Sequence, residues 1–174
     1  MKKIISTAGA SLSETLVTVL LLSIILSAVV SGIPALMSAY RKVRLKAEAQ
    51  TLLATAVTAV TDELRYAEQV TYADSSYTFY SAKRHATVQL VNGIYSDETS
   101  DDLSSNGIFI VNTASSSSSP LLTRETQTLG LHSSIEGNSM ENGCIVYTVS
   151  VISSDGKVIE STPLKVRPIS GYQG

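Results

Sequence analysis

Glu14 is the residue whose type and position point most clearly to chemistry, because it stands alone at the start of a long uncharged run. Residues 9–15 read GASLSET, and residues 15–39 contain no acid or base. A carboxylate at the edge of a membrane-spanning helix is unfavourable, since an aspartate at mid-bilayer costs roughly 2.5–3.5 kcal/mol on insertion scales. Glu14 therefore needs a compensating charge, and we expect a positive charge on another subunit to supply it.

The rest of the sequence contains no motif that is typical of a catalytic or metal-binding site. The two histidines, His85 and His132, lie in no metal-ligand spacing, and no nucleophile elbow or phosphate-binding glycine loop occurs. We expect His85 to be an exposed residue at a strand end and His132 to belong to a loop. Cys144 is the only cysteine, so an internal disulfide is excluded, and we expect this side chain to be buried as packing. The chain is predicted not to be an enzyme and to hold no cofactor or metal.

The apolar segment that follows Glu14 has the length of a membrane span. As a helix, residues 15–33 would extend over about 28 Å, which is enough for the core of a bilayer. No small-residue site for signal peptidase follows the segment. We predict a transmembrane helix, with Gly32 and Pro34 loosening or kinking it near its end.

The first third of the chain resembles the N-terminus of type IV prepilins and of the related pseudopilins. The matching features are the basic residues Lys2 and Lys3 in a short leader, then Gly9, an acid as the fifth residue after that glycine, and a long apolar helix. The resemblance implies that a membrane-embedded aspartyl peptidase removes residues 1–9 and methylates the new amino terminus at Ala10.

The chain departs from this pattern at two positions. Ala10 stands where phenylalanine is usual, and Ser13 stands where an apolar residue is common. A free amine at Ala10 would titrate near its ordinary value of roughly 7.7–8.0 and be largely charged. We expect this ammonium to pair with Glu14 of a neighbouring subunit and to set register between helices. The alternative is that Glu14 flanks an ordinary signal anchor at the membrane interface.

The chain is predicted to consist of four parts. These are a leader (1–9), a transmembrane and assembly helix (10–40), an amphipathic continuation of that helix (41–68) and an extracytoplasmic β-rich domain (69–174). Without the leader, 13 − 2 = 11 basic residues face 15 acidic ones. This balance gives no basic surface for general nucleic-acid binding.

One feature opposes an extracytoplasmic position of the C-terminal domain. The four basic residues Arg41, Lys42, Arg44 and Lys46 follow the span, whereas only two precede it. The positive-inside rule alone would place the C-terminal part in the cytoplasm. We favour the opposite orientation because the peptidase motif requires a cytoplasmic leader.

Periodicity predicts an α+β fold in which a long N-terminal helix packs against a small antiparallel sheet. Apolar residues recur at helical spacing along one stripe: Leu45, Ala49, Leu52, Ala56, Val60, Leu64 and Ala67. Strand patterns occupy residues 77–81, 87–91, 107–112 and 145–152. Segments 145–154 and 157–167 are predicted to form a hairpin with a type I′ turn at Asp155-Gly156, and Pro163 favours an edge strand.

Two loops stand out by composition. Residues 96–106 contain Asp97, Glu98, Asp101 and Asp102 but lack the ligand spacing of an EF-hand, so we prefer a solvated surface loop to a calcium site. Residues 114–120 are mostly serine and are predicted to be a flexible crossing.

These features predict a structural subunit of a type IV pilus-like or type II secretion-like filament. Its partners would be other pilin-like subunits, the prepilin peptidase, the assembly platform with its ATPase, and the membrane. The precursor would cross the cytoplasmic membrane once, with its globular domain outside, before it enters a cell-surface or envelope filament. The alternatives are a membrane-anchored binding module that does not polymerise and, with least support, an anchored enzyme.

Overall fold

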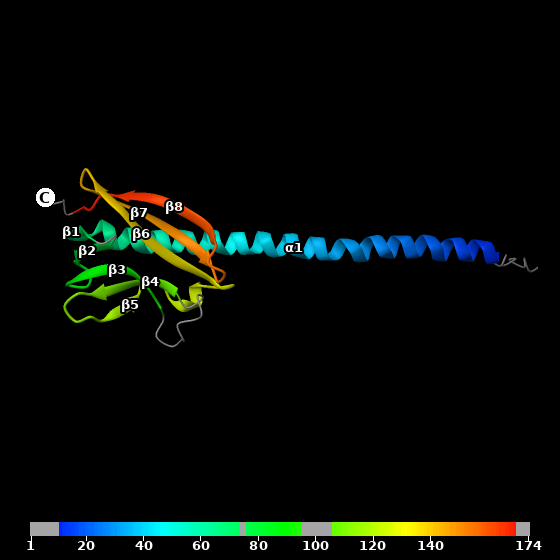
Figure 1. The fold of residues 1–174 in the computed structure, drawn as a ribbon, viewed down its shortest axis with the longest axis horizontal. Helices are drawn as coiled ribbons and strands as arrows, with labels where there is room; N and C mark the ends of the chain where they lie inside the picture. The colour runs from blue at the N-terminus through cyan, green and yellow to red at the C-terminus, as the bar shows by residue number, and fades with distance from the viewer. Residues whose placement is uncertain (1–10, 74–75, 95–105, 170–174) are drawn as a thin grey trace, which may run out of the picture. The chain divides into compact units, whose positions relative to one another are not determined.

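The computed structural model describes residues 11–73, 76–94 and 106–169. The predicted α+β class is confirmed, since one long N-terminal helix packs against antiparallel sheets (Figure 1). The described elements are α1 (Leu12–Arg65), β1 (Ala67–Ala73), β2 (Ser76–Ser81), β3 (Ala86–Ile94), β4 (Asn106–Asn112), β5 (Ser118–Pro120), the 3-10 helix η2 (Arg124–Thr126), β6 (Leu131–Glu141), β7 (Cys144–Ser153) and β8 (Val158–Val166). The chain divides into two compact units, Met1–Val43 and Arg44–Gly174.

In the first unit, α1 presents its apolar side chains to the surroundings. All of its described residues are exposed. The helix runs through Gly32 and Pro34 without interruption, and a Cβ at Gly32 would meet nothing within 4 Å. The predicted loosening or kink of the helix at these residues is therefore not found in the single chain. A proline removes one backbone hydrogen bond, but its dihedral angles can stay helical.

In the second unit, α1 buries the predicted stripe. Ala49, Ala56, Val60 and Leu64 are fully buried, and Leu52 is nearly so. The helix ends at Arg65, three residues before the expected end, and Ala67 is a buried residue of β1 instead.

A five-stranded antiparallel sheet has the order β1-β2-β3-β4-β5. The strand patterns at 77–81, 87–91 and 107–112 are confirmed as β2, β3 and β4. The prediction of a flexible crossing at 114–120 was wrong for its second half, because Ser118–Pro120 pairs with β4 and places Ser119 opposite Ile110. Edge strands are held by backbone hydrogen bonds, so a serine run can form one.

A three-stranded antiparallel sheet has the order β6-β7-β8. The predicted hairpin is confirmed as β7 and β8, with β8 at the edge and Pro163 within it. The predicted type I′ turn was wrong. Gly156 N–H donates to Ser153 O at 2.8 Å, and Gly156 alone has a positive φ, of 78°. The turn is thus centred one residue earlier, on Ser154 and Asp155, and Gly156 follows it in the left-handed region.

The two-residue turn with two positive φ angles lies in the other hairpin. Asn142 (φ 51°) and Gly143 (φ 72°) connect β6 to β7, and Glu141 faces Cys144 across the turn. These angles are those of a type I′ turn, which Asn-Gly favours.

One hydrophobic core joins α1 to both sheets. Its largest fully buried side chains are Leu64, Tyr77, Phe79, Ile108, Ile110, Leu131, Ile145 and Tyr147. The sheets are also linked by polar contacts. The hydroxyl of Tyr72 donates to Gly137 O at 2.8 Å, and that of Tyr77, which has one proton, lies within hydrogen-bond distance of both Ser139 O (2.8 Å) and Val146 O. The two tyrosines thus place hydroxyl groups against carbonyl oxygens of β6 and β7 where the two sheets meet.

Candidate functional site

Glu14 lies exposed in the first turn of α1. Its backbone N–H is close to two acceptors of Ser11, the carbonyl oxygen at 2.9 Å and Oγ at 3.3 Å. Ser11 and Glu14 have the Ser-x-x-Glu spacing of a capping box, in which the serine side chain accepts the third helical N–H. Ser11 thus caps the start of α1 through the backbone N–H of Glu14, and the spacing of the two residues suits the reciprocal bond of a capping box.

The carboxylate of Glu14 also lies at the positive end of the helix dipole, where a negative charge is stabilised by roughly 0.3–1 kcal/mol. Its side chain is exposed, so it is available to a partner outside the chain. The predicted processing residues Gly9 and Ala10, and the leader lysines Lys2 and Lys3, lie outside the described residues. Their roles stay predictions.

The apolar part of α1 satisfies several hydroxyl groups within the helix. Each donates to a carbonyl three or four residues earlier: Thr15 to Leu12 (2.9 Å), Thr18 to Glu14 (2.6 Å), Ser23 to Val19 (2.8 Å) and Ser31 to Ala28 (2.9 Å). Hydroxyls bonded in this way need no water, so they are compatible with lipid or with neighbouring helices. Within the described ranges, α1 is the one helix long and apolar enough to cross a membrane.

The two histidines occupy different environments. His85 is exposed in the turn between β2 and β3, next to the start of β3, as expected. The prediction that His132 belongs to a loop was wrong, because it lies in β6 and is 3% exposed. Burial lowers the pKa of the His132 imidazole, since desolvation disfavours the charged form.

Cys144 is half-buried rather than buried, which corrects the predicted packing role. It is the first residue of β7, directly after the Asn142-Gly143 turn, so it lies at the end of the sheet rather than in its middle.

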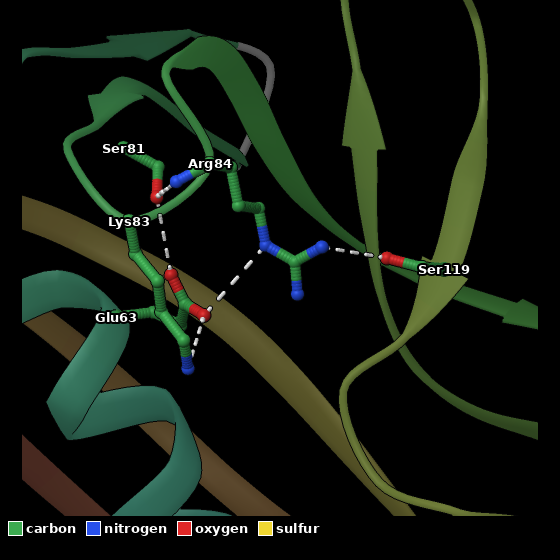
Figure 2. A network of polar contacts seen from close by, with 5 residues as sticks. All are labelled: Glu63, Ser81, Lys83, Arg84 and Ser119. Carbon is green, nitrogen blue, oxygen red and sulfur yellow. Dashed lines mark hydrogen bonds and ion pairs between the residues drawn. The ribbon is translucent and has the colours of Figure 1, made fainter.

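Glu63 forms the one network in which a buried charge meets two basic side chains in the described ranges of the chain (Figure 2). Its Oε1 lies 3.7 Å from Lys83 Nζ and 3.7 Å from Arg84 Nε, and Ser81 Oγ donates to its Oε2 at 3.4 Å. Arg84 Nη1 in turn donates to Ser119 Oγ at 2.9 Å. The network ties α1 to the β2–β3 turn and to β5.

The sequence analysis did not predict this network, although the position of Glu63 in the helix indicates that its carboxylate is buried. Glu63 comes three residues after Val60 and seven after Ala56, which is the spacing of the buried stripe. A carboxylate at such a position must find a positive partner, because an unpaired buried charge is strongly unfavourable. The adjacent Lys83 and Arg84 were the available pair, but only the folded chain brings them near.

The described residues contain no group of three or more potential metal ligands among histidine, cysteine and acidic side chains. The acidic residues from Asp97 to Asp102, which we considered for calcium, lie outside the described ranges.

Comparison of the chain with protein-family models, with curated proteins and with solved structures gives no match.

Proposed function

We propose that this chain is a structural subunit, a pilin, minor pilin or pseudopilin, of a type IV pilus-like or type II secretion-like filament. The observation that carries the proposal is the first turn of α1. An exposed acid, Glu14, lies in this turn and directly precedes an exposed apolar stretch of the helix that has the length of a membrane span. The same helix continues into a folded unit with antiparallel sheets.

In the proposed pathway, the precursor crosses the cytoplasmic membrane once and keeps residues 1–9 on the cytoplasmic side. A prepilin peptidase cuts between Gly9 and Ala10 and methylates the new amino terminus. The ammonium of Ala10 then meets the carboxylate of Glu14 on a neighbouring subunit. Such pairing compensates two charges that both leave water, and it fixes the axial register of the helices.

Transfer of the helix from lipid to a filament core changes its hydrophobic energy little, because lipid tails and leucine side chains are similarly apolar. The exposed hydroxyl-bearing residues do not oppose the transfer, since Thr15, Thr18 and Ser23 bond to their own helix. The movement of subunits from the membrane into the filament must therefore be driven by the pairing of charges between subunits and by an assembly platform with its ATPase. The β-rich unit would face outward in the cell-surface or envelope filament, and we propose no enzymatic activity for it.

The capping box favours one alternative. Because Ser11 and Glu14 have the spacing of a local helix cap, Glu14 has a use even in a chain that does not polymerise. The alternative function is a single-pass anchored binding module outside the cytoplasmic membrane.

Glu14 variants and the mass of the mature amino terminus separate these functions. We expect the native chain to begin at a methylated Ala10, and Glu14→Ala and Glu14→Gln to be cleaved normally but to enter filaments at least tenfold less. Glu68→Ala, which removes an exposed acid from β1, is the matched control and should assemble normally. A native chain that retains residues 1–9 would rule out the filament proposal. Normal assembly of Glu14→Gln would show that the cap, not intersubunit pairing, explains the carboxylate.

A further inference from the structure

Two basic residues, Arg41 and Lys42, lie on α1 directly after the end of its uncharged stretch. Both side chains are exposed, as is that of Tyr40 just before them. Within the described ranges, neither Arg41 nor Lys42 has a hydrogen-bond or ion-pair partner. Lys46 differs, because it pairs with Glu160 in the second unit. The charges at 41 and 42 are therefore free to meet a counter-charge outside the chain.

The position of this pair along the helix matches the thickness of a membrane. Arg41 comes 41 − 14 = 27 residues after Glu14 on one uninterrupted helix. At 1.5 Å per residue this separation is roughly 40 Å, close to the thickness of a bilayer with both headgroup layers, about 40–45 Å. With Glu14 in one headgroup layer, Arg41 and Lys42 reach the other. Tyr40 then lies at the boundary with the hydrocarbon, where tyrosine is enriched.

The three side chains also point to different sides of the helix. Successive residues of an α-helix are turned by about 100°, so Tyr40, Arg41 and Lys42 together cover more than half of its circumference. A groove on a partner protein would meet one of these sides. A layer of lipid headgroups surrounds a spanning helix and meets all of them, so the arrangement fits a membrane surface better than a one-sided partner.

The proposed orientation gives these charges a reason to seek anionic lipid. The membrane potential and the positive-inside rule both favour basic residues on the cytoplasmic side, whereas the proposed orientation places Arg41 and Lys42 outside. Residues 15–47 contain no acidic side chain that could offset this cost. Headgroup phosphates can offset it, because guanidinium and ammonium groups both donate charge-assisted hydrogen bonds to phosphate. A zwitterionic headgroup contributes less, since it carries a cation of its own.

We propose that Tyr40, Arg41 and Lys42 form a site for anionic phospholipid headgroups, such as phosphatidylglycerol, in the outer leaflet of the membrane that α1 crosses. Arg41 and Lys42 bind headgroup phosphates, and Tyr40 anchors the helix at the boundary below them. The proposal rests on the membrane anchoring that is part of the proposed function. It requires neither cleavage after Gly9 nor polymerisation.

The test is spin-label electron paramagnetic resonance of the full-length chain in phosphatidylcholine vesicles. Phosphatidylglycerol and phosphatidylcholine, each labelled near the end of one acyl chain, report the fraction of lipid whose motion contact with the helix restricts. We expect the anionic lipid to be preferred by about fivefold, the factor that one basic residue near an anionic surface contributes. The preference should decrease between about 0.01 M and 1 M salt, because the Debye length falls from roughly 30 Å to 3 Å. In bicelles, NOEs from the headgroup glycerol to the ring of Tyr40 would place the lipid without any substitution.

Three double variants assign the preference to the basic pair. Arg41→Gln with Lys42→Gln should abolish it, and glutamine keeps the helix because its helix propensity is close to that of lysine and arginine. Arg41→Lys with Lys42→Arg exchanges the two residues, keeps both charges and should retain the preference. Lys157→Gln with Arg167→Gln is the matched control, since it removes one lysine and one arginine from exposed positions of the β-rich unit and should change nothing.

Equal restricted fractions for the two lipids would overturn the proposal and leave the basic pair to a protein partner. A preference that survives in Arg41→Gln, Lys42→Gln would also overturn it, because other charges of the chain would then be responsible. If neither lipid is restricted, α1 does not span the bilayer, and the membrane anchoring is lost together with this proposal. Retention of residues 1–9 or failure to form filaments would instead contradict the filament function alone and leave the lipid preference unchanged.

Discussion

Glu63 shows how the partners of a buried charge decide its effect on stability. Its side chain is 4% exposed, whereas that of Lys83 is 79% exposed and that of Arg84 is 33% exposed. The two basic side chains can turn to water if Glu63 is lost, but the carboxylate cannot. The network should therefore respond asymmetrically to substitution.

We predict that the Glu63→Gln variant loses about 1 kcal/mol of unfolding free energy, because one hydrogen-bonded charge is replaced by an amide of the same shape. Lys83→Met combined with Arg84→Met should lose more, up to about 3 kcal/mol, since it leaves a buried carboxylate without a counter-charge. Urea unfolding of the full-length chain in micelles measures both. Lys46→Met is the control, because the Lys46–Glu160 pair (3.5 Å) is formed by a 65% exposed lysine and should contribute little. Equal losses for the two network variants would contradict this account.

His132 predicts a specific dependence of stability on pH. Burial lowers the pKa of its imidazole in the folded state below the ordinary value of about 6.5. The unfolded chain therefore takes up the proton first as the pH falls. Stability is fully present above about pH 6.5 and decreases below it until the pKa of the folded state is passed, by at most about 1.4 kcal/mol per pH unit.

The measurement is the unfolding free energy of the full-length chain between about pH 5 and 7, above the ordinary range of carboxylates. His132→Gln should remove much of the slope, since glutamine does not titrate. His85→Gln, at an exposed position, should leave the slope unchanged. A slope that survives in His132→Gln would assign it to other groups.

At the scale of elements, the tight turn between β6 and β7 depends on one residue without a side chain. Gly143 has a φ of 72°, in the left-handed region, where residues with a Cβ are disfavoured by about 1–2 kcal/mol. We predict that the Gly143→Ala variant loses about that much stability in thermal or urea unfolding. Ser154→Ala, at an exposed position of the other turn and without a positive φ, should lose less than half as much. A smaller loss in Gly143→Ala would mean that the turn relaxes into another type.

The elements that could be predicted from the sequence are those whose own residues show a helical or strand-like pattern. The buried stripe of α1 repeats every three or four residues, and β2, β3, β4 and β7 are rich in β-branched and aromatic residues. The strand β6 was missed because it is polar and contains Gly137. It is held by pairing with β7 and by Asn92 and the tyrosines of the other sheet. Such partners come from distant parts of the chain and leave no local pattern.

The turn error has a similar cause. Asp155-Gly156 and Asn142-Gly143 are both favourable two-residue turn sequences, but only the second has two positive φ angles. The register of β7 against β8 places Ser153 as the first residue of the turn, so the preferred pair is displaced by one position. Pairing of whole strands thus overrides the preference of a dipeptide.

The candidate sites divide in the same way. Glu14 was identified from sequence because a lone acid beside a long apolar run is visible without a fold. The Glu63 network was not, because it is assembled from α1, the β2–β3 turn and β5. Local chemistry is readable from composition, whereas the fate of a buried polar group depends on what the fold brings beside it.

At the scale of the whole molecule, orientation in the membrane is the property on which the proposed function depends most. The four basic residues between Arg41 and Lys46 oppose an external β-rich unit, and only Lys2 and Lys3 favour it. If Lys2 and Lys3 outweigh these four residues in setting the orientation, removal of the two lysine charges should leave some chains with the β-rich unit on the cytoplasmic side. The single cysteine, Cys144, lies in the β-rich unit and is half-buried, so it can report the side of the membrane on which that unit lies.

We predict that Cys144 of the wild-type chain reacts with a membrane-impermeant thiol reagent added to intact spheroplasts. In the Lys2→Glu, Lys3→Glu variant a substantial fraction of the chains should become unreactive until the membrane is opened with detergent, because the remaining positive charges then hold the β-rich unit inside. Arg41→Gln combined with Lys42→Gln is the matched control, since it removes two charges from the opposite side and should restore labelling when added to the leader variant. A wild-type chain that is labelled only after the membrane is opened would place the β-rich unit in the cytoplasm, where it could join neither a pilus nor an envelope filament.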